Sequence, residues 1–473
     1  MFLIRCVMIF YMRQLTGNIQ AERIKQLNTK DLKRGRYVLY WMQAAQRAEY
    51  NHALEHAIEK ANERRKPLLV VFGITNDYPQ ANLRHYWFML EGLKETQEAL
   101  EKKGVKMVIV QKSPSEAAIE FSKDAELVVV DAGQLRIQRK WRTETAKKIQ
   151  CRLTEVETNL IVPVHEVSEK QEFAARTIRP RIQRKLDYYM VQIKHSKVKV
   201  DSLGFRYSGF DISDINTAIS KLKIDKSVNK CTNFVGGTSQ AKKLLCKFIK
   251  DKLKDYAELR NEPSLDYQSN MSPYLHFGQV SPLYIALEVA KSKGKSRNAY
   301  LEELIIRREL SHNFVYYNSS YDKFDCLDPW AKQTLNLHRK DKREYIYTLN
   351  QLEQAKTHDE YWNAAQREMV LCGKMHGYMR MYWGKKILDW SRTPQEGFKI
   401  ALYLNNKYEL DGRDANAFAG VAWCFGKHDQ PWPQRKVFGK VRFMNAAGLK
   451  RKFDMQAYIK KIERLEKQIN KDS

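Results

Sequence analysis

Short runs of aliphatic and β-branched residues recur through the first third of the chain and then stop. They lack the alternation of apolar and polar positions that is typical of a sheet with one solvent-exposed face, so each run predicts a strand buried on both faces. Two helical stretches, 44–65 and 82–103, separate the early runs. This order predicts an α/β domain with a Rossmann-like parallel sheet over residues 36–170. The runs are VLYW (38–41), PLLVVFGI (67–74), VKMVIV (105–110), ELVVVD (126–131) and NLIVPVHEV (159–167).

Beyond residue 170 the strand pattern gives way first to linker-like and then to helical sequence. Residues 171–239 begin with a basic segment and continue as a polar stretch rich in Ser and Lys, so we expect an interdomain linker or surface excursion there. From Gln240 onward nearly every window has helical periodicity, with Gly and Pro at the breaks. We therefore expect a larger all-α domain over 240–473, and we treat residues 1–35 as an N-terminal extension.

The charge of the chain favours a polyanionic partner. Among its 473 residues, 83 Lys and Arg outnumber 55 Asp and Glu, which gives a formal net charge of +28. Such an excess is typical of nucleic-acid-binding proteins, and an anionic membrane surface is the other partner it allows. No apolar run approaches the ~18 residues that a membrane span needs. We expect a soluble protein.

The N-terminus and the cysteines indicate an intracellular location. The first residues, MFLIRCVMIFYMR, are apolar but broken by Arg5, and they lack the small-residue cleavage site of a signal peptide. The seven cysteines are scattered and contain no C-x-x-C pair, which favours a reducing compartment and no structural zinc. We expect a monomer without a metal site, cytoplasmic in a prokaryote or nuclear in a eukaryote.

Three tryptophans lie close together in the sequence between Thr357 and Asp414. Trp383 and Trp390 are seven residues apart, two helical turns, so their indoles project from nearly the same helix face about 10 Å apart. Trp362 precedes them. Aromatic residues at helical spacing usually fill a core. Indoles at this spacing can also relay electrons, so packing and electron transfer are the two interpretations.

Long motifs around these tryptophans resemble the class II cyclobutane pyrimidine dimer photolyases, which are light-driven DNA repair flavoenzymes. The resemblance covers nearly the whole chain from about Tyr37. It implies an all-helical C-terminal domain that holds FAD, active in its fully reduced form, between its helices. The motifs are THDEYWNAAQREMVLCGKMHGYMRMYWGKKILDW (357–390), LNNKYELDGRD (404–414), MSPYLHFGQVSP (271–282), LEELIIRRELSHNFVYYN (301–318) and VFGKVRFMNAAGLKRKFD (437–454).

The resemblance implies which residues hold the FAD. Arg380 and Asp411 match the ion pair beside the isoalloxazine, and Asn405 matches the residue that faces its N5. A guanidinium there lowers the cost of burying an anionic reduced flavin, although the same pair can be purely structural. An ordinary Ser or Asn helix cap is the alternative role for the 269–272 loop. The other implied contacts are Tyr256, Ser269, Asn270, Met271 and Ser272 at the phosphate and ribityl region, and Asn313, Asp414 and Asn416 elsewhere.

The resemblance also orders the tryptophans. Trp383 is implied to lie next to the flavin, Trp362 to be intermediate and Trp390 to be nearest to solvent. Light-excited oxidised flavin is then reduced by hole hopping outward through the three indoles.

A lesion pocket is implied by the same motifs, because photolyases flip the damaged nucleotides out of the duplex. Glu303 resembles the carboxyl group that hydrogen-bonds the dimer and stabilises its radical anion. Trp423 supplies an aromatic wall, and Met381 packs nearby. Where relatives have a second aromatic wall this chain has Arg307, whose guanidinium plane can stack in its place.

Further residues are implied to bind the DNA around the pocket. Arg260 and Trp432 match contacts near the gap that flipping leaves. Basic residues near the C-terminus match phosphate contacts, which give affinity without reading sequence. A solvated basic helix is the alternative for them. They are Arg435, Lys440, Arg442, Lys450 and Arg451.

Three functions are weighed on this basis. The first is a deoxyribodipyrimidine photo-lyase, a carbon–carbon lyase that repairs UV-damaged DNA by electron transfer from excited reduced FAD to a flipped-out cyclobutane dimer. The second is a cryptochrome-like photoreceptor that keeps FAD and the tryptophans but signals to a protein. The third is a flavin-free nucleic-acid-binding protein, which explains the charge but not the tryptophans. The resemblance also allows an antenna chromophore in the α/β domain, a deazaflavin or a folate, and no motif distinguishes the two.

Overall fold

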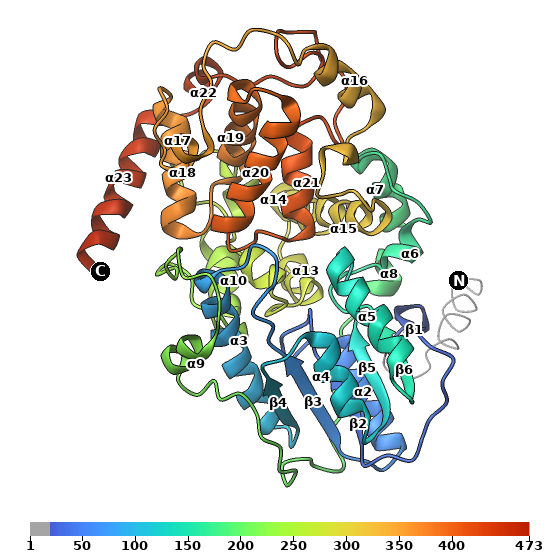
Figure 1. Ribbon diagram of the computed structural model, residues 1–473. Coiled ribbons are helices and arrows are strands. Elements are labelled where there is room, and N and C mark those ends of the chain that lie inside the picture. Colours follow the sequence, from blue (N-terminus) through green and yellow to red (C-terminus); the bar gives the residue numbers. More distant parts are fainter. Residues whose placement is uncertain (1–18, 473) are drawn as a thin grey trace.

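The computed structural model describes residues 19–472 and shows two lobes (Figure 1). The N-terminal lobe, blue to teal, holds a sheet of six strands in the order β1-β6-β5-β2-β3-β4. Strands β2 to β6 are parallel, and the short edge strand β1 is antiparallel to β6. The predicted parallel α/β domain is confirmed. The strands are β1 (Ile24–Gln26), β2 (Tyr37–Trp41), β3 (Leu68–Gly73), β4 (Lys106–Val110), β5 (Ala125–Asp131) and β6 (Arg152–Val156).

Alternate residues of each strand enter two separate cores, one on each face of the sheet. Val38 and Tyr40 of β2 pack with side chains of α2 and α3, whereas Tyr37 and Leu39 pack with side chains of α4 and α5. Because helices cover both faces, the strands need no polar side, which explains their continuous apolar runs. The helices are α2 (His52–Glu63), α3 (Leu83–Glu101), α4 (Pro114–Ser122) and α5 (Arg136–Lys148).

The last predicted strand, 159–167, is wrong in position. The fifth parallel strand is β6, which ends at Val156, and the later apolar run crosses to the helical lobe and ends in α6 (Val164–Val167). There the carboxylate of Glu309 accepts the backbone N–H groups of Ile161 (2.7 Å) and Val162 (3.2 Å). The run is apolar because it is buried between the lobes.

The sheet begins earlier than residue 36. Strand β1 lies inside the predicted extension 1–35 and pairs Ile24 with Val156. Next to it, the buried Arg23 side chain donates to the carbonyl of Ile161 at 2.6 Å. Residues 1–18, which include the apolar MFLIRCVMIFYMR segment, lie outside the described residues.

The segment predicted as a linker, 171–239, packs on both lobes: α7 (Ala175–Gln183) lies against the helical lobe, and the later residues return to the sheet lobe (Figure 1). Its long irregular stretch, green in Figure 1, runs along the sheet lobe. The rings of Phe205 and Tyr207 lie 5.6 and 6.4 Å from that of Tyr37. This later part of the segment is therefore partly buried surface of the sheet lobe. The segment's other helices are α8 (Leu186–Tyr189) and α9 (Ile215–Lys221).

The C-terminal lobe is helical, and the described residues after Val156 form no strand. Its helix boundaries follow from capping. The Asp359 side chain accepts the N–H of Trp362 (3.0 Å) at the start of α18, and Gly373 ends that helix in the left-handed conformation at φ 68°. The helices are α10 (Thr238–Asp251), α11 (Tyr256–Leu259), α12 (Ser272–His276), α13 (Pro282–Ala290), α14 (Lys295–Leu301), α15 (Arg308–Tyr317), α16 (Pro329–Leu337), α17 (Leu349–Glu353), α18 (Glu360–Cys372), α19 (Gly377–Trp390), α20 (Pro394–Tyr408), α21 (Ala415–Cys424), α22 (Ala446–Lys452) and α23 (Met455–Asp472).

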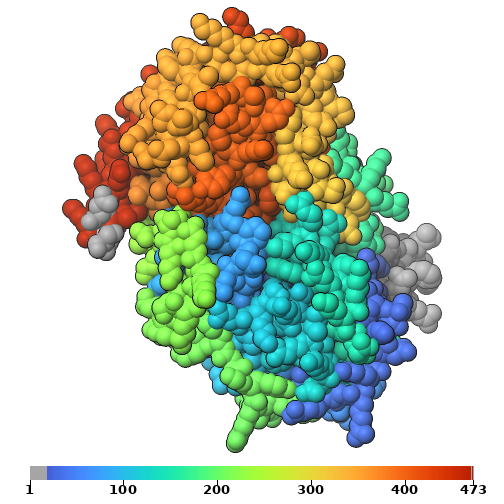
Figure 2. All heavy atoms as spheres, viewed as in Figure 1, coloured from blue at the N-terminus to red at the C-terminus, as the bar shows by residue number. Residues whose placement is uncertain are grey.

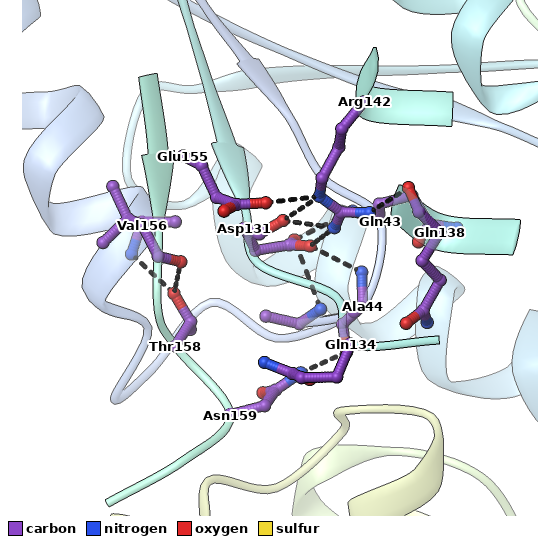
Figure 3. Close-up of polar contacts among 12 residues, drawn as sticks. Gln43, Ala44, Asp131, Gln134, Gln138, Arg142, Glu155, Val156, Thr158 and Asn159 are labelled. Atoms are coloured by element: carbon purple, nitrogen blue, oxygen red, sulfur yellow. Dashed lines mark hydrogen bonds and ion pairs between the residues drawn. The ribbon is translucent and has the colours of Figure 1, made fainter. Parts of the chain in front are cut away.

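A polar cluster closes the crevice where the strand order reverses, between β2 and β5 (Figure 3). Asp131, at the end of β5, is fully buried and accepts the backbone N–H groups of Gln43 (2.9 Å) and Ala44 (2.8 Å). Arg142 of α5 lies 3.2 Å from Asp131 and 3.2 Å from Glu155. In doubly wound sheets this crevice is the usual ligand site. Here the buried ion pair fills it.

The two lobes are in broad contact (Figure 2). The segment that enters α3 carries much of this contact. Arg84 donates to the carbonyl of Tyr408 at 2.8 Å, and Asn82 donates to the carbonyl of Lys407 at 2.8 Å. These bonds hold the end of α20 against the N-terminal lobe.

Candidate functional site

The three tryptophans form one chain of rings in the core of the helical lobe. Trp362 of α18 lies parallel to Trp383 of α19 with ring centroids 6.3 Å apart, and it meets Trp390 edge-on at 5.6 Å. Trp383 donates from Nε1 to Gln366 (2.8 Å). All three are at most 2% exposed. The contacts place Trp362 between the other two, as expected, and the end that meets a flavin stays a prediction.

The aromatic path continues beyond Trp390, which is itself buried. Its ring lies 5.3 Å from Tyr347 and 5.3 Å from His358. His358 stacks on Tyr345 at 3.7 Å, and Tyr345 is 40% exposed. The solvent end of the path is therefore formed by these rings. Sequence reasoning missed them, although two tyrosines stand together in EYIY (344–347).

Arg380 holds two carboxylates. Its Nη1 lies 3.2 Å from Asp411, as the motif predicted, and its Nη2 lies 2.8 Å from Glu409, which was not predicted. Burial raises the pKa of Glu409 to about 8. Burial also opposes ionisation of Asp411, but the charge of Arg380 outweighs it and lowers the pKa of that acid. Glu409 stands two residues before Asp411 in the same motif, which is the signal that could have found it.

Asp414 joins two elements near this cluster. Its Oδ1 accepts the N–H of Asn416 at the start of α21 (2.8 Å), and its Oδ2 lies 3.3 Å from Nδ1 of His276. Burial works against the charge, but the hydrogen bond and charge of His276 hold the pKa of Asp414 well below its usual range. His276, in the motif MSPYLHFGQVSP, is a further site residue that sequence reasoning missed.

Asn405 is buried at 1% exposure and donates from Nδ2 to the side-chain oxygen of Asn406 at 3.3 Å. Asn406 in turn donates to Gln80 of the N-terminal lobe at 2.7 Å. The amide pair thus lies where α20 meets the sheet lobe. One amide is anchored by its neighbour, so its orientation is set before any ligand binds.

Asn416 and Asn313, two of the residues implied to contact the cofactor, have surroundings unlike those of the Arg380 cluster. The Asn416 side chain is exposed at the start of α21. The Asn313 amide accepts the N–H of Glu172 (2.7 Å) and donates to the carbonyl of Lys170 (3.0 Å). These contacts favour a role for Asn313 in holding the chain ahead of α7.

The loop 269–272 lies between an aromatic group and the Arg380 cluster. Asn270 has a positive φ of 59°, which Asn tolerates, and turns the chain into α12. Ser269 is close enough to Tyr300 to act on the pKa of that phenol, and the ring of Tyr300 lies 5.3 Å from that of Tyr256. At the other end, Ser272 lowers the pKa of Asp411. The predicted phosphate and ribityl contacts are therefore brought together with the ion pair.

The cluster fits a flavin. The Nε of Arg380 is buried and has no hydrogen-bond partner among the described residues, although both Nη atoms are paired. A buried donor without a partner is costly, and a ligand acceptor removes that cost. Arg380 supplies a permanent cation and a donor, Asn405 a buried amide, and the acids acceptors, and these are groups that the polar edge of an isoalloxazine can use.

Glu303 lies in a π-helical segment, Glu302–Arg307, between α14 and α15. Its carboxylate accepts from Nη1 of Arg260 at 2.8 Å, and the Arg260 guanidinium lies 5.6 Å from the ring of Tyr256. Such wide turns are frequent at functional sites. Arg307, four residues on, contacts Glu302 instead (3.5 Å), so its stacking role is untested.

A second group gathers around α21. The thiol of Cys424 donates to the carbonyl of Met381 at 3.8 Å, which places α19 beside α21. The guanidinium of Arg442 lies 5.8 Å from the ring of Trp423 and 4.9 Å from that of Trp432. Trp432 is 40% exposed. An aromatic and cationic surface thus surrounds Trp423.

The basic C-terminal residues lie on exposed loop and helix positions. The N–H of Trp432 donates to the carbonyl of Lys440 (2.8 Å), and the backbone of Arg435 pairs with Gly439. This compact loop holds its cations toward solvent, where phosphates can reach them. The exposed cations are Arg435, Lys440, Lys450 and Arg451. No helix among residues 19–472 is long and apolar enough to cross a membrane.

Comparisons with known proteins decide the family. A family model described as DNA photolyase matches residues 38–198. The chain is 50% identical over 449 residues to the deoxyribodipyrimidine photo-lyase of Methanothermobacter thermautotrophicus, covering 94% of this chain and 99% of that protein. The chain belongs to the DNA photolyase family. The recognition of a photolyase from the motifs is confirmed at this level.

Solved photolyases share the fold. A bacterial class III photolyase from Agrobacterium tumefaciens superposes with a TM-score of 0.73 at 17% identity, covering 92% of this chain and 87% of that chain. An archaeal photolyase from Sulfolobus tokodaii, described as holding two FAD molecules, gives a TM-score of 0.69 at 15% identity, covering 90% and 89%. The sheet lobe followed by a helical lobe is thus the photolyase arrangement.

Proposed function

We propose that this chain is a light-dependent DNA repair enzyme that splits cyclobutane pyrimidine dimers. The observation that carries light-driven electron transfer is the chain of indoles, Trp383, Trp362 and Trp390, which starts one helical turn from Arg380 and continues to the surface ring of Tyr345. Structural packing alone does not require a continuous series of ring contacts from a charged cluster to solvent. The named relatives that match nearly the whole chain support the same activity.

The Arg380 cluster is the proposed cofactor site. When bound, reduced FAD absorbs near-UV or blue light and supplies the electron that opens the cyclobutane ring. Arg380 keeps a permanent positive charge beside it and lowers the cost of holding an anion. Asn405 presents an amide that can donate or accept as protonation at N5 changes. Ser269, Ser272 and Tyr256 hold the phosphate and ribityl region.

The lesion is proposed to enter as a flipped dinucleotide. Trp423 and Met381 form an apolar wall, and Glu303 hydrogen-bonds the pyrimidines and stabilises the charge that develops on them. Arg260 holds the Glu303 carboxylate in position at 2.8 Å. Arg307 is half exposed and lies 3.5 Å from Glu302, and its guanidinium plane is proposed to stack on the opposite side.

DNA affinity is proposed to come from the exposed cations around Trp432. Arg435, Lys440 and Lys450 reach phosphates, which gives affinity and register without sequence preference. Trp432 fills part of the gap that the flipped nucleotides leave. The tryptophan chain restores the reduced state by moving electrons inward from the surface rings.

The chain is proposed to belong to the class II subgroup and to have an antenna site. The class rests on the long motifs of 271–318 and 357–414. A cavity of about 90 Å³ lies over the ends of β2 and β3, lined by Tyr78, Trp141, Arg413 and His276. Because His276 also contacts Asp414, a chromophore there is next to the proposed flavin site. The free volume is small for a deazaflavin or a folate, so side chains must move to admit either.

An absorption spectrum before and after blue light, followed by a repair assay, tests the proposal. We expect flavin bands that bleach on illumination with an external reductant. We also expect light-dependent restoration of thymines in an oligonucleotide with a single cyclobutane dimer, and none with a (6-4) photoproduct.

The outcomes separate the alternatives. A yellow protein that photoreduces but restores no thymines rejects repair and favours a cryptochrome-like photoreceptor. A colourless protein that cannot be reconstituted with FAD rejects both and leaves a flavin-free nucleic-acid-binding protein.

A further inference from the structure

Lys385 is a buried cation with no hydrogen-bond or ion-pair partner in the part of the chain that the structure describes. It lies on α19, one turn after Met381, with 0% exposure, and its Nζ has no hydrogen-bond partner among the described residues. A buried ammonium without a counter-ion is costly, and lysines are almost never fully buried unless paired. Packing alone does not account for it, because methionine fills the same space without the charge.

The ammonium of Lys385 lies against a wall of the proposed lesion pocket. Its Nζ is 4.9 Å from the centroid of the Trp423 ring, across the contact between α19 and α21. The other groups that act on it are Cys424 on α21, Asp429 on the following loop and Arg442. Burial lowers the pKa of Lys385 to about 8, Arg442 adds to this, and Cys424 and Asp429 oppose it.

We propose that Lys385 is a positioning residue for repair: its ammonium fixes the Trp423 indole and keeps an unscreened positive charge behind that wall. The inference rests on the proposed function, since it needs Trp423 to face the lesion. An electron that arrives on a pyrimidine dimer creates negative charge, which a buried cation stabilises far more than an exposed one does. Arg442 lies half exposed at the rim and is screened by solvent.

A matched pair of neutral variants isolates this charge. Lys385→Met removes the ammonium and keeps the length of the side chain. Lys386→Met is the control, because Lys386 pairs with Asp389 at 3.0 Å and lies 5.4 Å from Trp390 instead. The measurement is the number of dimers repaired per absorbed photon by full-length, flavin-loaded, pre-reduced protein between pH 6.5 and 9.5, a range of about three units around the pKa. Flavin content, affinity for undamaged DNA and Tm are measured alongside.

We expect Lys385→Met to lower repair per photon about three- to tenfold at pH 7, with unchanged flavin content and DNA affinity, while Lys386→Met stays within about twofold. We expect the repair yield of the wild type to fall as pH rises through about 8, because Lys385 becomes neutral. The repair yield of Lys385→Met is expected to lack this decrease. Its Tm is expected to stay the same or rise, since an unpaired buried charge is lost.

The proposal is overturned if Lys385→Met repairs as well as the wild type at pH 7, or if the two pH profiles coincide. A lowered Tm with an unchanged yield per photon also overturns it and assigns Lys385 to stability. A wild-type protein that holds flavin yet repairs no dimer rejects the proposed function instead, and is recognised before any variant is made.

Discussion

The guanidinium of Arg380 lies 2.8 Å from the carboxylate of Glu409 and 3.2 Å from that of Asp411, so one buried cation is shared by two acids. A single positive charge cannot neutralise both. The pKa values of the two acids therefore shift in opposite directions. Burial raises the pKa of Glu409 to about 8, whereas the charge of Arg380 lowers the pKa of Asp411. Glu409 is the acid that carries the proton near neutral pH.

Glu409 is predicted to make stability depend on pH. Its folded-state pKa lies above the ordinary value of 4.5, so its contribution to stability is complete below that pH and is lost as pH rises to about 8. Glu409→Gln removes the titration, and we expect the free energy of unfolding to change less between pH 5 and pH 8. Urea unfolding at the two pH values measures this, and parallel losses in variant and wild type would contradict it.

Arg380→Met leaves the buried carboxylate of Asp411 and the buried carboxyl group of Glu409 without their cation. We expect a loss of about 3–5 kcal/mol in the free energy of unfolding and a large fall in bound flavin. Arg339→Met is the control, because Arg339 is exposed, and such changes stay within about 0.5 kcal/mol. Chemical denaturation and the ratio of flavin to protein absorbance measure the two effects. A stable, flavin-loaded Arg380→Met protein rules out the assigned site.

Trp362→Phe breaks the chain of indoles at its middle ring, because benzene is harder to oxidise than indole. Photoreduction of bound flavin is expected to slow by about tenfold or more, since each 1.4 kcal/mol is a factor of ten in rate. Repair by chemically reduced enzyme stays near the wild-type level. Trp87→Phe, in the other lobe, is the control. Equal photoreduction rates in the two variants would contradict electron transfer through Trp362.

Glu303→Gln is expected to lower dimer repair per photon by about tenfold while binding of undamaged DNA stays unchanged, because glutamine still accepts the hydrogen bond from Arg260 and only the charge beside the lesion is lost. Glu302→Gln is the neighbouring control, since Glu302 pairs with Arg179 at 2.7 Å. Repair assays on a single-dimer oligonucleotide distinguish them. If Glu302→Gln is the more impaired variant, the lesion contact is assigned to the wrong carboxyl group.

Gly373→Ala tests the left-handed end of α18. A Cβ there lies 2.4 Å from the Cys231 sulfur, and the φ of +68° is strained for any L residue. We expect a loss of about 1–3 kcal/mol. Gly420→Ala in α21, where nothing lies within 4 Å of the added Cβ, should instead stabilise by about 0.5–1 kcal/mol. Thermal unfolding compares the pair, and equal shifts in Tm contradict the assignment.

The sheet was predictable from sequence because helices cover both of its faces. That condition makes strands such as Leu68–Gly73 continuous apolar runs. The run 159–167 has the same composition for another reason, burial between the lobes, so periodicity alone placed the last strand wrongly. Short edge strands such as Ile24–Gln26 are half exposed and carry no comparable signal.

The candidate site was predictable where long motifs specify residues, as for Arg380 and Asp411. Other partners depend on how helices meet in space. Glu409 joins Arg380 because the chain after α20 turns back on α19, and Tyr347 joins Trp390 through a loop more than forty positions earlier in sequence. Lys385 is one of two adjacent lysines, and only the packing of α19 on α21 shows which of them is buried.

The three indoles belong to a single hydrophobic core within the C-terminal lobe. Their spacing therefore does not depend on the contact between the lobes. Under the proposed function, we expect the flavin to be recharged through them at the same rate with and without bound DNA.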